Sequence, residues 1–237
     1  MSNQLSGFAR SIMDVYLGGI IDECVVTVED GKAKIKAMDL TTTLFVDTVT
    51  EFDQDDCVIG VGNMDLLSKI IAITDAITGF SESHIEFKPE KSSKVRFLLF
   101  EPDLVPSFNT EWTDDIVDQE LASNNYCEPF KLKASKLEQF KVWNDIFKIP
   151  SIGITVKNGA LSFHCGREAS HQFAVKLGNV SGLDSLSIKV LGKFILPVLN
   201  ALDFELDPVL YLSEEGPVVI RTKTSTWMIQ PLEQDDK

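Results

Sequence analysis

The residues of this chain that could carry chemistry do not assemble into a known catalytic motif. Gly60-Val-Gly62 begins like a dinucleotide-binding loop, but Asp65 stands where the third glycine of that loop would be. His84-Ile-Glu86 resembles the opening of a zinc deaminase signature, yet no P-C-x-x-C follows it. The chain also lacks a Walker loop, a G-x-S-x-G elbow and an H-E-x-x-H sequence. We therefore expect a protein that is not an enzyme.

Cysteine and histidine are too scattered along the chain to suggest a metal site. None of the four cysteines forms a Cys-x-x-Cys pair, and Cys24 and Cys165 fall in strand-like runs, as is typical of reduced core thiols. The three histidines lie far apart, each in a strand-like run, and we interpret them as structural. The sequence predicts neither a metal nor a cofactor.

Basic side chains remain as candidates for ionic chemistry, although the chain is strongly acidic overall. Thirty-six acidic residues against 22 basic ones give a net charge of −14, which taken alone argues against a nucleic-acid partner. The acids, however, crowd into turns, loops and the C-terminal tail, for example at Asp53, Asp55, Asp56, Glu214 and Glu215. The helix-patterned runs carry lysine instead. The distribution of charge is therefore more informative than its sum.

Two stretches of the chain repeat the same pattern and must position those basic residues. Val26-Thr-Val-Glu-Asp-Gly31 and Ile154-Thr-Val-Lys-Asn-Gly159 each place alternating apolar residues before a tight-turn dipeptide. Asp-Gly and Asn-Gly between alternating runs are strong hairpin signals, because both turn positions need positive φ. The sequence thus predicts two copies of one unit, in which a helix, a hairpin, a further strand, a second helix and more strands follow one another.

Four helices are predicted from apolar residues that recur with helical spacing. In the run from Met64, an apolar side that includes Leu66, Leu67 and Ile73 is expected to be buried. Ser135, with Glu138 three residues later, predicts a capping box at the start of the third helix. Pro197 should bend or shorten the fourth helix, which is expected to carry Lys193 together with Lys189 on its exposed side. The four predicted ranges are Leu5–Tyr16, Asn63–Ile77, Ser135–Phe147 and Val190–Leu202.

The repeat divides the chain into two domains, residues 1–105 and 126–237. Residues 106–125 between them hold Pro, Ser, Asn and many acids, and we expect an extended interdomain connector there. No apolar run approaches the ~20 residues that span a bilayer, and the N-terminus lacks the features of a signal peptide. We expect a cytoplasmic protein without a membrane partner.

Several segments in order along the chain resemble one family. Lys36-Ala-Met-Asp39 closes the first hairpin as in eukaryotic and archaeal DNA sliding clamps, and Val61-Gly-Asn-Met-Asp-Leu-Leu-Ser-Lys-Ile-Ile71 resembles the second helix of phage clamp domains. Phe130-Lys-Leu-Lys-Ala-Ser-Lys-Leu-Glu-Gln-Phe140 is similar to the strand and helix that open a clamp's second domain. Gly216-Pro-Val-Val-Ile220 and Trp227-Met-Ile-Gln-Pro231 are similar to the closing hairpin and C-terminal segment. Across nearly the whole chain, the pattern resembles clamps of the PCNA and tailed-phage type.

The resemblance implies an α+β DNA clamp fold with two similar domains, each with two helices packed on antiparallel sheet. Six such domains close a ring, so three chains would form a homotrimer around double-stranded DNA. Edge strands near Lys94–Phe100 and Gln172–Leu177 would pair between subunits. Helices would line the hole and hold phosphates without reading sequence. The candidate DNA-facing residues are Arg10, Lys69, Lys136, Lys141, Lys148, Lys189 and Lys193.

The resemblance also implies a hydrophobic groove that binds a short peptide of DNA polymerase or another client, and a clamp loader that opens the ring. Leu40 stands where many relatives have a small polar residue, and the acidic connector suggests that client motifs carry basic flanks. The groove positions carried over are Met38, Leu40, Phe45, Ile116, Leu121, Pro217, Val219, Met228, Ile229 and Pro231.

Two alternatives from other classes stay open. One is a monomeric processivity or transcription-accessory factor with the same pair of domains but no ring. The other is an enzyme whose site lies hidden at the domain boundary. As a clamp, the protein would work in the cytoplasm (the host cytoplasm if it is viral), at replicating DNA.

Overall fold

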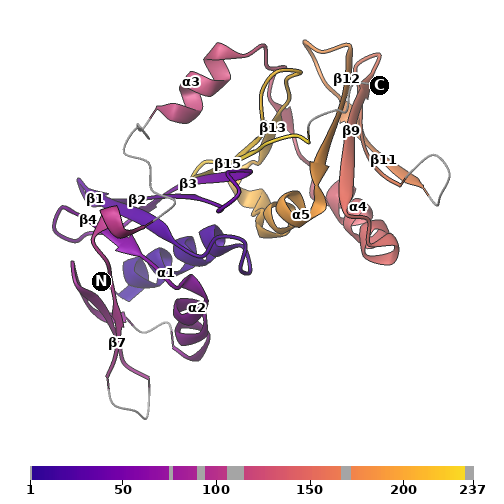
Figure 1. Ribbon diagram of the computed structural model, residues 1–237. Coiled ribbons are helices and arrows are strands. Elements are labelled where there is room, and N and C mark those ends of the chain that lie inside the picture. Colours follow the sequence, from indigo (N-terminus) through magenta and orange to yellow (C-terminus); the bar gives the residue numbers. More distant parts are fainter. Residues whose placement is uncertain (1, 75–76, 90–93, 106–114, 167–171, 233–237) are drawn as a thin grey trace. The chain divides into compact units, whose positions relative to one another are not determined.

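The computed structural model describes residues 2–74, 77–89, 94–105, 115–166 and 172–232, without the side chains of residues 2–6. The chain divides into two compact units, Met1–Glu111 and Trp112–Lys237. They are drawn from indigo to magenta and from magenta to yellow in Figure 1. Within the described residues, no helix is long and apolar enough to cross a membrane.

Among its described residues, unit 1 contains two α-helices, one short 3-10 helix and two antiparallel sheets. The strands of the first sheet follow the order β4-β1-β2-β3, and those of the second β5-β6-β7. The helix α1 packs on β2 and β3 and against α2. The elements are α1 (Ser2–Tyr16), β1 (Cys24–Glu29), β2 (Lys32–Met38), β3 (Leu44–Glu51), β4 (Cys57–Val61), α2 (Met64–Ile73), β5 (Ile77–Ser81), β6 (His84–Phe87), β7 (Val95–Leu98) and the short 3-10 helix η1 (Pro102–Leu104).

Unit 2 repeats this order of elements after one additional helix and strand. Its first sheet has the order β11-β10-β9-β12, the counterpart of β3-β2-β1-β4, and its second sheet has the order β15-β14-β13-β8. The elements are α3 (Ile116–Ser123), β8 (Phe130–Lys131), α4 (Ala134–Phe147), β9 (Ser151–Lys157), β10 (Ala160–Cys165), β11 (Phe173–Asn179), β12 (Ser185–Leu191), α5 (Gly192–Ala201), the 3-10 helix η2 (Phe204–Leu206), β13 (Val209–Tyr211), β14 (Val218–Arg221) and β15 (Ser225–Ile229). The predicted α+β class and internal duplication are confirmed.

The two predicted hairpin turns have nearly the same backbone. Asp30 and Gly31 have φ values of 52° and 72°, and Asn158 and Gly159 have 51° and 71°. Positive φ at both central residues matches the right-handed twist of the flanking strands. The turns pair Glu29 with Lys32 and Lys157 with Ala160, which sets the register of each hairpin.

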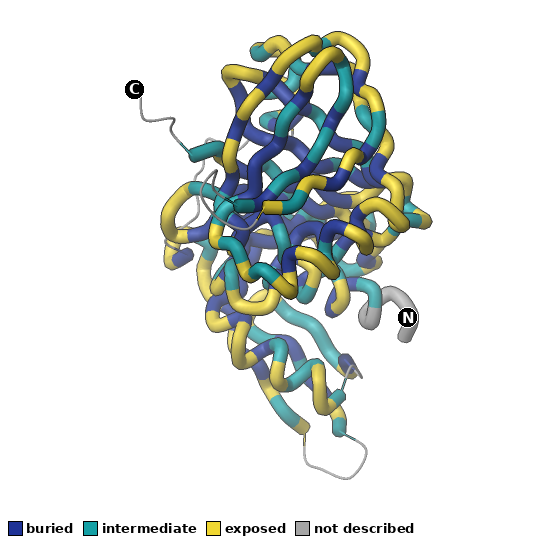
Figure 2. Tube along the Cα trace, turned by 90° about the vertical axis from the view of Figure 1, so that its right-hand side faces the viewer, coloured by how far each residue is buried: buried dark blue, intermediate teal, exposed yellow. Residues whose placement is uncertain are grey.

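Alternation along the strands builds a separate core in each unit, visible in Figure 2 as dark blue positions alternating with teal or yellow ones. In unit 1, the rings of Phe8 and Phe52 stack with centroids 4.1 Å apart, and Phe80 meets Phe52 edge-on at 4.9 Å. In unit 2, Phe140 of α4 packs edge-on against Phe163 of β10 at 5.4 Å. These contacts fix α1 and α4 on their sheets.

Cysteines contribute to these cores as reduced thiols. Among the described residues all four cysteines are free, and Cys24, Cys127 and Cys165 are buried. Burial raises the pKa of the Cys165 thiol to about 12, so it stays protonated and lies 3.8 Å from the buried Asn144 Oδ1, to which it donates. The predicted core role of Cys24 and Cys165 is confirmed.

The helix boundaries differ from the predicted ones in two informative places. The helix α4 begins at Ala134, with Lys133 at the N-cap and no side-chain capping bond, so the predicted capping box of Ser135 and Glu138 is wrong. The chain enters α4 almost directly from β8, which leaves Ser135 inside the first turn. The helix α5 continues through Pro197 for ten residues in all.

The apolar side predicted for α2 is only partly buried. Met64 and Leu67 are the buried residues of this helix, whereas Leu66 and Ile73 are exposed. The helix also ends at Ile73 rather than at the predicted Ile77, which belongs to β5. Helical periodicity identifies the apolar residues of α2 correctly but assigns too many of them to the core of unit 1.

Candidate nucleic-acid interface and client surface

The basic residues of the unit 1 helices differ in their partners. Arg10 of α1 is exposed and, within the described part of the chain, forms no ion pair. Lys69 of α2 is exposed too, but its Nζ lies 2.5 Å from Asp65 Oδ2. The hydrogen bond from Lys69 lowers the pKa of Asp65, which also accepts from the Tyr16 hydroxyl at 3.1 Å. The charge of Lys69 is therefore partly neutralised in place.

The basic residues of the unit 2 helices show the same division. Lys141 of α4 is mostly covered, with its side chain 18% exposed and its Nζ 3.1 Å from Glu138 Oε1. Lys136 in the first turn of α4 is exposed, and so is Lys148, which caps the C-terminus of α4 in a left-handed conformation. Lys193 of α5 is exposed, with its Nζ 4.5 Å from the centre of the Phe194 ring.

Lys189 does not lie on a helix, so its predicted place is wrong. It belongs to β12, where it pairs with Gly153 of β9, and its carbonyl oxygen accepts a hydrogen bond from the Leu232 amide at 2.7 Å. Leu186, Ile188 and Val190 alternate with exposed residues along this strand. This alternation has the period of a strand, so Lys189 points out from the sheet rather than sharing a helix face with Lys193.

The client-surface candidates of unit 1 surround a turn organised by one carboxylate. Asp39 is buried and accepts from the amides of Thr41 at 2.9 Å, Thr43 at 2.7 Å and Leu44 at 2.6 Å, and from the Thr41 hydroxyl. The turn leaves Leu40 74% exposed, whereas Met38 is half-buried and Phe45 is buried. Leu40 and Met38 are therefore the accessible members of this set.

Three of the seven client-surface candidates of unit 2 are buried. Pro217, Val219 and Ile229 are buried, and the last two belong to the β14–β15 pair. The half-buried residues of the predicted set are Ile116, Leu121, Met228 and Pro231. The client surface predicted from the sequence therefore mixes buried residues of unit 2 with accessible ones.

The second part of the connector is a helix, contrary to the extended conformation that we expected. Residues 106–114 lie outside the described residues, but α3 spans Ile116–Ser123. Val117 of α3 is buried, and Asp118 accepts from Arg221 of β14 at 2.7 Å. The Tyr126 hydroxyl lies 3.2 Å from Glu120 Oε1 and 3.0 Å from the Pro217 carbonyl oxygen. These contacts fasten α3 to the β13–β14 end of unit 2.

Both strands predicted to meet between subunits lie at sheet edges. Among the described residues, β7 ends the β5-β6-β7 order and β11 ends the β11-β10-β9-β12 order. On the unit 1 sheet, Glu86 of β6 accepts from Lys94 at 2.8 Å and from Arg96 at 2.9 Å. His84 Nε2 lies 3.6 Å from the same carboxylate. Sequence reasoning missed this cluster, although alternation along β6 and β7 could have placed Glu86 opposite Arg96.

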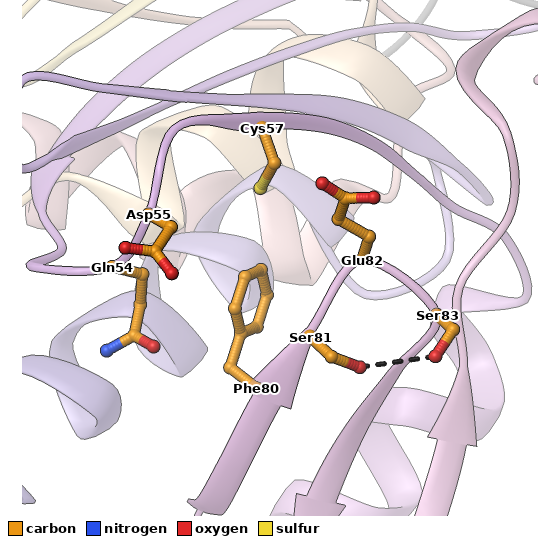
Figure 3. Close-up of a pocket in the computed structure, with 7 residues that line it drawn as sticks. All are labelled: Gln54, Asp55, Cys57, Phe80, Ser81, Glu82 and Ser83. Atoms are coloured by element: carbon orange, nitrogen blue, oxygen red, sulfur yellow. Dashed lines mark hydrogen bonds between the residues drawn. The ribbon is translucent and has the colours of Figure 1, made fainter.

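A pocket of about 450 Å³ opens in unit 1 between β4 and the β5–β6 turn. Figure 3 shows Phe80 between Gln54 and Glu82, with Cys57 above it and Ser81 hydrogen-bonded to Ser83. Burial and the nearby carboxylates of Glu82, Asp56 and Asp55 raise the pKa of the Cys57 thiol, which disfavours the nucleophilic thiolate. Within the described residues, no group of three or more His, Cys, Asp or Glu side chains is arranged to hold a metal.

Solved structures of known clamps superpose on this chain along nearly its whole length. PCNA from Thermococcus kodakaraensis matches with a TM-score of 0.67 at 12% identity, over 94% of this chain and 97% of that one. PCNA from Entamoeba histolytica matches with a TM-score of 0.67 at 13% identity, over 97% and 96%. The chain has the DNA sliding clamp fold. A beta clamp of Helicobacter pylori, solved bound to a DNA ligase peptide, matches with a TM-score of 0.65 at 13% identity, over 97% of this chain and 65% of its own.

Neither a protein-family model nor a curated protein sequence matches the chain. The clamp fold is thus kept at an identity of only 12–13% to these solved structures. The predicted family resemblance is confirmed at the level of the fold.

The Glu86 cluster makes the stability of the β5-β6-β7 sheet depend on pH. Lys94 and Arg96 lower the pKa of Glu86 from 4.5 to about 2. A lowered folded-state pKa contributes stability that is present above about pH 4.5 and is lost as the pH falls through about 2. Glu86→Gln should therefore be less stable than the wild type at pH 6, with the difference vanishing towards pH 2.

The free energy of unfolding by urea, measured at pH values from 6 to 2, checks this expectation. Glu51→Gln, at the exposed end of β3, is the matched control and should follow the wild type throughout. A constant difference between Glu86→Gln and the wild type at every pH would show that the carboxylate charge is not the cause.

Proposed function

We propose that this chain is a DNA sliding clamp, a ring-shaped processivity factor that encircles duplex DNA without sequence specificity. It would tether DNA polymerase and other clients through a hydrophobic peptide-binding surface. The observation that carries the proposal is the duplicated clamp fold, which spans nearly the full length of the PCNA chains that it resembles. No catalytic role is assigned to any residue.

The ring would be a homotrimer, because each chain contributes two clamp domains and six domains close the circle. We assign the domains to residues 1–105 and 126–237, with residues 106–125 as the connector. The open edges of β7 and β11 support pairing between subunits, since each carries backbone groups that a neighbouring strand can satisfy. Closing the ring would remove both edges at once.

DNA would be held by charge and by the closed ring rather than by base contacts. Phosphate contacts from lysine and arginine carry no sequence information, and they exchange readily with water and counterions. The exposed Lys136, Lys148 and Lys193 support this role, because they form no ion pair with a described carboxylate. Lys69 and Lys141 contribute less charge, since each is paired within its own helix.

Clients would bind where Leu40 and Met38 are accessible in unit 1, together with the half-buried predicted residues of unit 2. A beta clamp of similar fold binds a DNA ligase peptide, which supports peptide binding as the mode of recognition. Because acidic residues crowd the connector, the client segments should carry basic flanks. The partners would include DNA polymerase and a clamp loader, in the cytoplasm at replicating DNA.

The assembly state tests the proposed ring against its main alternative. A monomeric accessory factor with the same domains would have a mass near 26.3 kDa at every dilution, whereas the clamp would have three times that mass. We expect the trimer at micromolar concentration, measured by light scattering over a dilution series. A mass that stays at one chain would exclude the ring.

Reversing the charge of exposed helix lysines should weaken DNA tethering. The triple variant Lys69→Glu, Lys136→Glu and Lys193→Glu is expected to keep the wild-type mass but to lose processivity in loader-dependent primer extension. The slope of log affinity against log salt should fall by about 0.9 for each phosphate that the variant no longer neutralises.

Lys32→Glu with Lys157→Glu is the matched control for this loss. Both lysines are exposed beside the hairpin turns rather than on helices. Equal processivity of the triple variant and this control would contradict the assignment of the helices to DNA.

Placing a charge on the accessible client surface should block peptide binding. Met38→Glu and Met228→Glu change half-buried residues, unlike the buried Ile229, so the fold should tolerate them. Each is expected to weaken binding of the cognate polymerase tail peptide at least about tenfold, since apolar anchors supply most of the affinity of such sites. Titration calorimetry measures the change, and Val58→Glu, exposed on β4, serves as control. Unchanged affinity in both variants would rule out this surface.

A further inference from the structure

One face of the β11-β10-β9-β12 sheet in unit 2 is basic. The helices α4 and α5 pack on the opposite face of this sheet. Alternation along the strands places Lys157, Lys176 and Lys189 on the face that the helices leave free. All three lysines are exposed, and none forms an ion pair with a described carboxylate. The four strands contain no Asp or Glu, so this positive charge is uncompensated.

The equivalent sheet of unit 1 also carries three lysines, but it balances each of them with a carboxylate. These lysines alternate along β2, and their partners belong to the neighbouring strands β1 and β3. Because the two sheets are counterparts in a duplicated fold, the fold itself does not require the lysines of unit 2 to stay unpaired. The balanced pairs of unit 1 are Lys32 opposite Glu51, Lys36 opposite Asp47, and Lys34 with its Nζ 3.2 Å from Glu29 Oε2.

The imidazole of His164 lies among the lysines of the basic face. His164 pairs with Gly153, and a Cβ atom on Gly153 would lie only 2.1 Å from His164 Cε1, so the ring covers this glycine. Lys189 pairs with Gly153 from the other side. Burial, and after it the charges of Lys157 and Lys189, lower the pKa of His164. A glycine inside a strand weakens that strand, and here it permits the close approach of the ring.

The other side chains of the basic face are small and mostly polar. Thr155, Ser162 and Ser187 form one row across three strands of the sheet. None of the exposed large apolar side chains belongs to these four strands. Protein partners rely on apolar anchors, and single-stranded nucleic acid relies on aromatic rings against which its bases stack. Lysine, serine and threonine are instead common contacts of the phosphate backbone.

We propose that the basic face is a second binding surface for duplex DNA, on which Lys157, Lys176 and Lys189 hold phosphates outside the ring. The helices on the opposite side of the sheet would line the hole, so this face points away from it. Along β9, Lys157 is four residues from the partner of Lys189, about 13 Å at ~3.3 Å per residue. That separation is close to the ~12 Å width of the major groove, so the two lysines can reach phosphates on both of its sides.

This inference goes beyond the proposed function, because it needs neither a closed ring nor a loader. A covalently closed circular duplex is therefore the suitable probe, since it has no end over which a closed ring could thread. Without a loader, binding to the circle reports on surfaces outside the hole. Fluorescence anisotropy of a labelled circle, followed over a series of salt concentrations, measures this binding with the full chain.

Removing three charges from one sheet or from its counterpart tests the inference. The unit 2 variant should bind the circle at least about tenfold more weakly than the wild type near 50 mM salt, and the slope of log affinity against log salt should fall by about 2.7, or ~0.9 for each lost phosphate contact. The unit 1 variant is the matched control, because it changes the net charge equally, and it should bind like the wild type. The unit 2 variant combines Lys157→Gln, Lys176→Gln and Lys189→Gln, and the control combines Lys32→Gln, Lys34→Gln and Lys36→Gln.

The pH dependence of binding tests the place of His164 in this surface. With its lowered pKa, His164 is neutral near pH 7 in the free protein, and nearby phosphates would stabilise its protonated form. Binding would then take up a proton, so the affinity of the wild type should rise as the pH falls from about 8 to about 6. The other titratable groups that face His164 are lysines, which stay charged in this range, so His164→Gln should remove the pH dependence. Affinities of the wild type and of His164→Gln that change equally with pH would exclude His164 from the surface.

Failure of this inference is distinguishable from failure of the proposed ring. Equal losses in the two triple variants would overturn the inference, because net charge alone would then explain binding. A wild type that binds polyglutamate but not the circle would overturn the assignment to DNA. Loader-dependent processivity should be unchanged in the unit 2 variant, since DNA inside the ring would not meet this face. A wild type that is monomeric yet binds the circle through these lysines would exclude the ring alone. Circular dichroism and thermal unfolding establish that each variant is folded.

Discussion

Everything in this fold depends on the register that two tight hairpin turns impose. Asp30-Gly31 and Asn158-Gly159 adopt positive φ at both central positions, so the strands on either side cannot slide past one another. That register decides which residues of β1, β2, β9 and β10 face the helices. Because the same turn occurs in the same place in both units, the two sheets carry α1 and α4 in the same manner.

Acidic and basic residues of this chain occupy different elements, and this distribution is more informative than the net charge. Acidic residues collect in loops and around the unit 1 pocket, where burial and, after it, the nearby carboxylates raise the pKa of the Cys57 thiol. The helices carry cations, but Lys69 and Lys141 are paired with carboxylates of their own helix. An anionic body would repel DNA everywhere except where the remaining cations gather, which would suit the proposed clamp, since it would hold DNA at those cations without adhering to it elsewhere.

The sequence was sufficient for features that local chemistry determines. The tight-turn dipeptides predict the hairpins, and the repeated order of runs predicts the duplication. Where a short run of residues fits both the helical and the strand period, local chemistry does not decide which element forms. Val190 and Leu191 fit the start of a helix, although the alternation before them continues the strand that holds Lys189. The eight residues of α3 escape prediction because a short polar helix depends on contacts such as Asp118 with Arg221, which lie 103 positions apart.

Hydrophobic periodicity also does not say which molecule will cover an apolar residue. It selects Ile73 as apolar, but only the packed structure shows that unit 1 leaves this side chain exposed. The predicted client surface shows the opposite error, because it includes residues that are buried in the interior. Val219 and Ile229 match the family pattern, yet they are interior residues of a strand pair, and only the burial of each side chain separates them from Met228.

The turn held by Asp39 has a thermodynamic consequence for recognition. Three amides and a hydroxyl donate to that single carboxylate, so the loop between β2 and β3 is ordered before any ligand arrives. Leu40 is consequently displayed on a preorganised backbone, and a ligand that covers it loses little conformational entropy to loop ordering. Under the proposed function, client segments of a few residues would then bind there with useful affinity and still dissociate quickly enough for one client to replace another.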